Sequence, residues 1–190
     1  MKELSLHILD ILQNSVKANA SRIRLTITED LPRNVFAITI VDNGGGMNKE
    51  LLARVTNPFA TTRTTRRVGL GLALFQAAAE QCNGSLTIQS EEGKGTTVTA
   101  VFEHNHIDRM PLGDIVGTII TFLIGSPAID FGYRYWVNGK CFEFETAAVK
   151  AELGDFPLSD VNVVNFLTEY LQTQLTNLAD LKNSPPGPLS

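Results

Sequence analysis

The sequence is poor in cysteine, in excess positive charge and in long apolar runs. Its two cysteines, Cys82 and Cys141, stand alone, with no CxxC pair and no histidine cluster of ligand spacing. This pattern excludes a disulfide framework and a zinc site, and it favours a reducing, cytoplasmic location. Sixteen basic residues against twenty acidic ones give a net charge of -4, so we expect no nucleic-acid partner.

Apolar stretches are also too short for a membrane protein. The run over 115–124 is apolar but cannot span a bilayer, and the N-terminus shows no signal-peptide pattern. We therefore expect no membrane partner. With 43% hydrophobic and 19% charged residues, the chain suits a globular protein with one ordinary domain and an extension.

The periodicity of apolar residues predicts the order α–β–β–α–loop–α–β–β for the first part of the chain. The predicted elements are a helix over 3–19, strands over 21–28 and 35–41, a helix over 48–55, a loop over 57–68, a helix over 70–81, and strands over 86–89 and 96–102. Neighbouring strands without helical crossovers favour a mixed, mostly antiparallel sheet with helices on one face. The predicted fold class is thus α+β, a two-layer sandwich.

A break near 104–111 separates residues 1–104 from a predicted small α+β extension over 105–182. In the extension we expect a helix over 112–123, a hairpin of strands 131–137 and 141–144, and helices over 147–153 and 161–178. The hairpin turns at Asn138-Gly139, a strong turn signal. The last segment, 183–190, carries three prolines and is predicted to be a flexible tail.

The most informative segment is Asp42-Asn43-Gly44-Gly45-Gly46-Met47. An acidic residue ends a buried strand, and three glycines follow almost at once. Glycine lets the backbone approach a flat ligand closely, and Asp42 then offers a fixed carboxylate at that place. Taken alone, the segment is equally typical of an Asp-Gly hairpin turn between two strands.

Three further segments carry chemistry. Asp10, Asn14 and Lys17 fall on one polar stripe of the first helix, which alone would be an ordinary solvated face. A loop rich in Thr and Arg, with Thr61, Thr62, Arg63, Arg66 and Arg67, runs into Gly69-Leu70-Gly71-Leu72 at the start of a helix. The last strand opens with Gly93-Lys94-Gly95-Thr96-Thr97.

Each segment suits one part of a purine nucleoside triphosphate bound with a divalent cation. The Asp42 carboxylate accepts from an exocyclic amino group, which favours adenine over guanine. Glycines at a helix N-terminus form an anion site, and arginines add charge beside it. The side-chain carbonyl of Asn14 is a hard ligand suited to Mg²⁺. Asp10 is placed to orient or deprotonate an attacking water or hydroxyl.

Four motifs in this order, "DILQNSVKANA", "DNGGGM", "PFATTRTTRRVGLGLALFQ" and "GKGTTVTAVF", resemble the GHKL superfamily. This superfamily includes gyrase, the MutL mismatch-repair proteins, histidine kinases and anti-sigma-factor kinases, which share the Bergerat ATP-binding fold. The resemblance covers residues 3 to about 103.

The resemblance implies ATP and Mg²⁺ as cofactors and gives the residues roles. Asp42 would read the adenine amino group with Gly46 close to the base, Asn14 would bind Mg²⁺, and residues 61–68 would form a mobile ATP lid. The implied nucleotide-binding set is Asn14, Lys17, Asp42, Gly44, Gly46, Met47, Thr61, Thr62, Arg63, Gly69, Leu70, Gly71, Leu72 and Thr96. The implied catalytic residue is Asp10.

Two departures from the family pattern matter. ATP-hydrolysing relatives have Glu where this chain has Asp10, whose carboxylate reaches about 1 to 1.5 Å less far, and misplacement on that scale costs about a hundredfold in rate. Only nine residues precede Asp10. We therefore expect no preceding phosphoacceptor-histidine helices and interpret the chain as a stand-alone module. His7, His104 and His106 are interpreted as structural.

The leading hypothesis is an ATP/Mg²⁺-binding signalling protein that phosphorylates a separate protein partner, with an anti-sigma-type kinase as one version. A non-catalytic ATP-dependent switch and a slow ATPase are the alternatives. ATP and ADP are the expected small-molecule partners. The lid and the extension are the expected contact surfaces for a protein partner or for a second copy of the chain.

Overall fold

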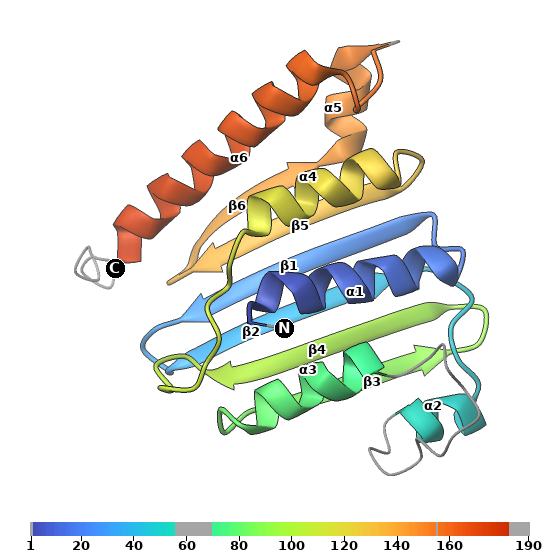
Figure 1. Ribbon diagram of the computed structural model, residues 1–190, viewed down its shortest axis with the longest axis vertical. Coiled ribbons are helices and arrows are strands. Elements are labelled where there is room, and N and C mark those ends of the chain that lie inside the picture. Colours follow the sequence, from blue (N-terminus) through green and yellow to red (C-terminus); the bar gives the residue numbers. More distant parts are fainter. Residues whose placement is uncertain (1, 56–69, 155, 183–190) are drawn as a thin grey trace.

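Six strands form one mixed sheet in the computed structural model, which describes residues 2–55, 70–154 and 156–182. The strand order across the sheet is β3-β4-β2-β1-β5-β6 (Figure 1). The elements are α1 (Leu4–Lys17), β1 (Arg22–Asp30), β2 (Val35–Asp42), α2 (Lys49–Val55), α3 (Leu70–Glu80), β3 (Ser85–Glu91), β4 (Gly95–Glu103), α4 (Ile115–Gly125), β5 (Asp130–Val137), β6 (Lys140–Glu145), α5 (Thr146–Leu153) and α6 (Val161–Lys182).

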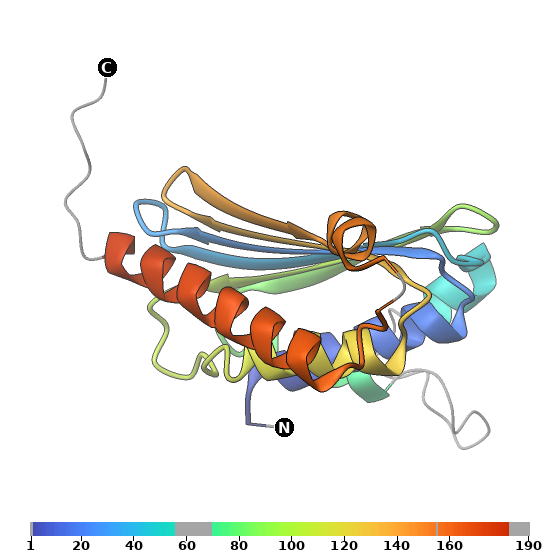
Figure 2. The ribbon, with the colours of Figure 1, turned by 90° about the horizontal axis from the view of Figure 1, so that it is seen from above.

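The two faces of the sheet differ in what covers them. Along β1 and β2, alternate residues are buried, as period-2 side-chain direction requires. Figure 2 shows α1, α3, α4 and α6 on the same side of the sheet. The prediction of an α+β sandwich with a mixed sheet and helices on one face is confirmed.

Helix α1 lies against the sheet through an apolar stripe with helical spacing. Leu4, Ile8 and Leu12 are completely buried, and Phe75 of α3 is buried beside them. Full burial of such a side chain contributes roughly 1.5 to 3 kcal/mol. This stripe fixes α1 in rotation and so decides where its polar residues point.

Helix α4 is almost entirely apolar because it is covered on several sides. Ile119, Phe122 and Leu123 are buried, and α4 packs against both α1 and α6. The helix begins at Ile115 rather than at the predicted residue 112, because Asp114 caps it by accepting from the Gly117 N–H at 2.8 Å. Among the described helices, none combines the length and the apolar character that a bilayer span needs.

The segment beyond residue 104 adds two strands to the sheet. Strand β5 pairs with β1 in parallel and β6 pairs with β5 in antiparallel, across the predicted Asn138-Gly139 turn. Strands from both sides of the predicted 104/105 boundary thus share one sheet and one hydrophobic core. The division into two domains stays a prediction, and the predicted tail over 183–190 lies outside the described residues.

A largely buried polar cluster joins these parts and is called the Glu29 cluster: Glu29, His104 and Tyr135. Glu29 is 3% exposed, and its Oε2 lies 2.7 Å from Nε2 of His104. The Tyr135 hydroxyl donates to Oε1 of the same carboxylate. Burial, and then the charge of Glu29, raise the pKa of Tyr135 far above its ordinary value.

Candidate functional site

Asp42 is the last residue of β2, and two donors hold its carboxylate. Its Oδ1 accepts from the Gly44 N–H at 2.9 Å, and its Oδ2 accepts from the Ser15 hydroxyl at 2.7 Å. The side chain is 9% exposed. A carboxylate oxygen accepts more than one hydrogen bond, so both oxygens keep acceptor capacity for a ligand.

Thr96 lies directly across from Asp42 on the neighbouring strand β4. Residues opposite each other in an antiparallel pair point to the same face of the sheet. Both residues border a hollow of about 320 Å³ at this end of the sheet. The register therefore brings together two residues that the sequence assigned to one site.

The glycine segment packs tightly against the turn between β3 and β4. Gly46 has φ of +63°, and a Cβ on it would lie 2.0 Å from the Glu91 carbonyl oxygen. The Gly45 carbonyl accepts from Gly93 N–H at 2.8 Å, and the Met47 N–H donates to Ser90 at 2.8 Å. The Asp-Gly hairpin alternative is wrong, because α2 and not a paired strand follows β2.

Asn43 was not expected to have a role of its own. Its Oδ1 accepts from the backbone N–H groups of Ser21 and Arg22, at 3.0 and 2.8 Å. It thus joins the end of β2 to the start of β1 and steadies the position of Asp42. An Asn just after a strand is the sequence signal for such side-chain-to-backbone bonds.

Asp10, on the polar stripe of α1, lies beside the start of α3. Asp10 is half-buried, and its Oδ2 lies 3.0 Å from the place that a Cβ of Gly71 would take. Asn14 and Lys17 are exposed, one and two turns further along α1. The absence of a side chain at Gly71 lets the carboxylate reach the first turn of α3, where the helix dipole presents its positive end.

Several predicted site residues cannot be placed. Thr61, Thr62, Arg63 and Gly69 lie outside the described residues, as does the predicted lid over 61–68. Leu70 is the first residue of α3, and Leu72 is half-buried against the core. The ligand contacts of Gly44, Gly46, Met47, Leu70, Gly71 and Leu72 stay predictions.

His7 lies in α1 one turn before Asp10, and it is buried. Its ring is 2% exposed and stacks on Phe75 with ring centroids 5.1 Å apart. Burial, and then the charge of the N-terminus, lower the pKa of His7, whereas Asp10 opposes this change more weakly. These surroundings favour the neutral imidazole.

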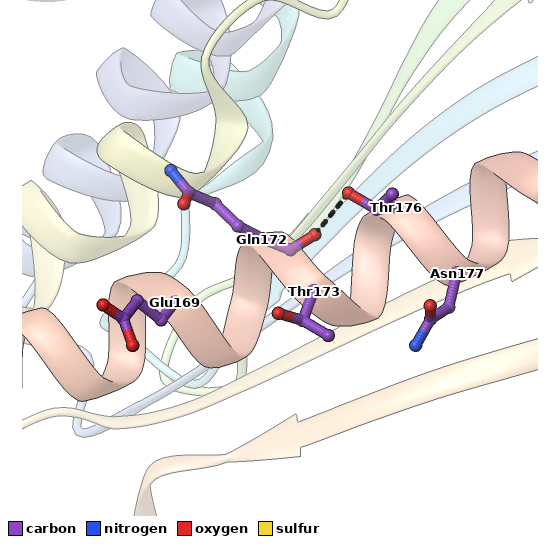
Figure 3. A pocket seen from close by; sticks show the side chains of 5 residues that line it. All are labelled: Glu169, Gln172, Thr173, Thr176 and Asn177. Atoms are coloured by element: carbon purple, nitrogen blue, oxygen red, sulfur yellow. Dashed lines mark hydrogen bonds between the residues drawn. The ribbon is translucent and has the colours of Figure 1, made fainter.

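A second hollow, of about 370 Å³, lies on the outward face of α6 (Figure 3). Its lining is Glu169, Gln172, Thr173, Thr176 and Asn177, all on one helix. It has no buried carboxylate and no glycine segment, so it is a poor candidate site. Within the described ranges, no group of three His, Cys, Asp or Glu side chains is arranged to hold a metal ion.

Known proteins resemble the first part of the chain. The tetrathionate sensor histidine kinase TtrS of Salmonella typhimurium is 33% identical over 101 residues, which cover 51% of this chain and 17% of that protein. The signal transduction histidine-protein kinase AtoS of Escherichia coli is 35% identical over 99 residues, 52% and 16% of the two chains. The non-motile and phage-resistance protein of Caulobacter vibrioides is 31% identical over 118 residues, 57% and 14%. The chain therefore spans less than a fifth of the length of these relatives.

A solved structure and a family model agree with these relatives. The crystal structure of the N-terminal domain of a DNA repair protein aligns with a TM-score of 0.54 at 18% identity, over 75% of this chain and 52% of that one, which supports the fold. The family model described as histidine kinase-, DNA gyrase B-, and HSP90-like ATPase matches residues 2–106, more than half of the chain. The chain belongs to this family of ATPases.

Proposed function

We propose that this protein binds ATP together with Mg²⁺ and acts as a signalling protein that phosphorylates a separate protein partner. The observation that carries the proposal is the buried Asp42 carboxylate, which is held by the Gly44 N–H and belongs to a residue that borders a hollow together with Thr96. A carboxylate only accepts hydrogen bonds. It therefore fits the 6-amino group of adenine and repels the 6-carbonyl oxygen of guanine.

The residues of α1 and α3 suit the phosphate end of the nucleotide. The start of α3 carries the positive end of a helix dipole, and the missing side chain at Gly71 lets the Asp10 carboxylate lie beside this turn. Lys17 adds a positive charge from the exposed side of α1. Asn14 offers an amide oxygen, which suits Mg²⁺ because this ion keeps several waters and takes few protein ligands. Bound Mg²⁺ would supply neutralisation of phosphate charge.

The reach of the Asp10 side chain bears on whether the protein is a kinase or a switch with little ATP turnover. Its carboxylate is positioned by α1, one turn before Asn14, where it can take a proton from a hydroxyl or a water. Because Asp is shorter than the Glu of hydrolysing relatives, a second candidate function is an ATP-dependent switch with little or no turnover. In that case nucleotide binding orders the lid, and the ordered lid recruits a partner.

A partner surface is proposed on the lid and on the strands and helices beyond residue 104. Strands β5 and β6 continue the sheet that carries Asp42, so the second part of the chain lies on the same rigid support as the site. We propose a cytoplasmic location. A second copy of the chain is the alternative occupant of this surface.

A melting scan with ATP, ADP and GTP, each with and without Mg²⁺, tests the nucleotide proposal. A ligand that binds only the folded chain stabilises it by about 2.7 kcal/mol at a hundred times its dissociation constant. We expect ATP and ADP to raise the melting temperature, with a larger effect in Mg²⁺, and GTP to leave it unchanged. An unchanged melting temperature with millimolar ATP and Mg²⁺ would overturn the proposal.

The substitution Asp10→Glu separates the two candidate functions. We expect ATP turnover to rise about tenfold or more while ATP affinity changes less than twofold, because only the reach of the base changes. Asp108→Glu makes the same lengthening at an exposed residue and serves as the control. An absence of turnover in both Asp10 forms, with ATP still bound, favours the switch.

A further inference from the structure

Ser15 is a polar residue on the buried face of α1. Its side chain is 3% exposed, and its neighbours along this face are Ile8, Ile11 and Leu12, all buried. A buried hydroxyl without a partner costs free energy, so a serine at this place needs a hydrogen-bond acceptor. Two acceptors lie within reach.

The hydroxyl has one hydrogen for these two acceptors. It lies 2.7 Å from Oδ2 of Asp42 and 3.2 Å from the Ile11 carbonyl oxygen. Serine inside a helix commonly donates to the carbonyl four residues before it. The shorter contact to a charged acceptor is the stronger one, so the hydrogen belongs to Asp42.

The carboxylate of Asp42 is therefore held from two directions. The Gly44 N–H fixes Oδ1 from the loop after β2, and the Ser15 hydroxyl fixes Oδ2 from the helix. With one donor on each oxygen, the plane of the carboxylate cannot turn freely about its terminal torsion. A ligand then meets an acceptor that is already oriented, and less entropy is lost on binding.

We propose that Ser15 is a positioning residue that orients the Asp42 carboxylate toward the 6-amino group of a bound adenine, and that it thereby sets the selectivity for this purine. The inference rests on the proposed nucleotide function and adds a specificity determinant to that site. Ser15 acts through Asp42, so its effect falls on ligands that carry the amino group. If the Ser15–Asp42 hydrogen bond only held α1 against β2, its loss would weaken the binding of all nucleotides equally.

The test compares ATP with purine riboside triphosphate, which lacks the 6-amino group. Dissociation constants are measured by calorimetry in Mg²⁺ for the wild type, Ser15→Ala and Ser5→Ala. Ser5 is a matched control, because it is also a buried serine of α1 but donates to Glu3 and not to Asp42. We expect Ser15→Ala to weaken ATP about tenfold and purine riboside triphosphate less than twofold. Ser5→Ala should change the ratio of the dissociation constant for purine riboside triphosphate to that for ATP by less than twofold.

A second variant protects the test against loss of folding. Ser15→Cys changes a single atom, oxygen to the larger sulfur, and replaces the hydroxyl by a weak donor. The ratio of the dissociation constant for purine riboside triphosphate to that for ATP should then fall by an intermediate factor. If both variants leave this ratio unchanged, the proposed role of Ser15 is overturned. ATP binding by the wild type would still uphold the nucleotide function in that case. If the folded wild type binds neither ligand, both proposals fall.

Discussion

The two ends of the β1–β2 pair each bury a carboxylate, but the surroundings differ. Asp42 meets a backbone N–H and a serine hydroxyl, and it borders a hollow. Glu29, at the other end, lies between His104 and Tyr135 and joins the first part of the chain to β5. A buried acid alone therefore does not mark a ligand site. The difference lies in whether the partners close around the carboxylate or leave acceptor capacity toward an open space.

The same two ends also differ in how their left-handed glycines are packed. Gly46, after β2, lies against the Glu91 carbonyl, and Gly139, in the β5–β6 turn near Glu29, has open space where a Cβ would lie. Asn138, which precedes Gly139, donates its N–H to the Glu29 carbonyl oxygen. At the Asp42 end, glycine is required for close backbone packing. At the Glu29 end, glycine is required only for the turn.

The largest expected effect is on folding, from Gly46→Ala. The new Cβ would meet the Glu91 carbonyl oxygen at 2.0 Å in a backbone conformation with φ of +63°. The left-handed conformation and the clash together should lower the free energy of unfolding by about 3 kcal/mol or more. Urea denaturation measures this loss.

Gly139→Ala is the matched control for that prediction. Its φ is +84°, and a Cβ would have no atom within 4 Å, so only the conformational term remains, about 1 kcal/mol. Equal losses in the two variants would contradict the comparison. They would mean that the β3–β4 turn moves aside from Gly46 without resistance.

The next effect separates the two carboxylates by function. Asp42→Asn should weaken ATP about a hundredfold, roughly 2.7 kcal/mol, because a charge-assisted acceptor is lost and the new amide can present a donor. Glu29→Gln should change ATP affinity less than twofold. Asp42 lies six residues along β2 from Phe36, the partner of Glu29, which is about 20 Å.

Glu29→Gln should lower the stability of the fold although it leaves ATP affinity nearly unchanged. Glu29→Gln weakens one buried and one partly buried hydrogen bond to a charged group, and we expect the free energy of unfolding to fall by about 1 to 2 kcal/mol. Glu143→Gln removes the charge of an exposed carboxylate that pairs with Arg134, and it should lower the free energy of unfolding by less than about 1 kcal/mol. Calorimetric titration with ATP and urea denaturation measure the two properties. Loss of ATP binding in Glu29→Gln would show that the two ends are coupled.

Sequence alone predicted the elements where the signal is local. The apolar spacing of α1 and α3 and the alternation along β1 and β2 each contain enough information for the element type. The ends were less accurate: α6 was predicted to end at residue 178 and continues to Lys182, and β3 extends beyond 86–89 to Ser85 and Glu91. The added residues of β3 are polar or charged, so backbone pairing with β4 sets the ends of this strand rather than the hydrophobic pattern.

Pairings between distant segments could not be predicted from these patterns. The parallel pairing of β5 with β1 joins residues more than a hundred positions apart, and no spacing rule selects it. The contact of Ser15 with Asp42 is similar, because a serine on an apolar helix face shows only that some partner exists. Asp42 itself was predictable because strand, acid and glycines are contiguous in the sequence. The roles of Thr61, Thr62, Arg63 and Gly69 stay predictions from the family resemblance.

The smallest effect concerns a third buried titratable group, His7, whose Nδ1 has no hydrogen-bond partner in the part of the chain that the structure describes. Its pKa is lowered in the folded state, mainly by burial, from an ordinary value of about 6.5. The unfolded chain therefore binds the proton more readily. The contribution of neutral His7 to stability is complete above about pH 6.5 and is lost as the pH falls from there toward the folded-state pKa.

His7→Leu should remove this part of the pH dependence, so its unfolding free energy should decline less between pH 7.5 and 5.5 than that of the wild type. Ser5→Ala, a non-titrating change in the same helix, should keep the wild-type slope. If the unfolding free energies of His7→Leu and the wild type changed in parallel with pH, the buried imidazole would accept a proton without a free-energy penalty, which would contradict this prediction.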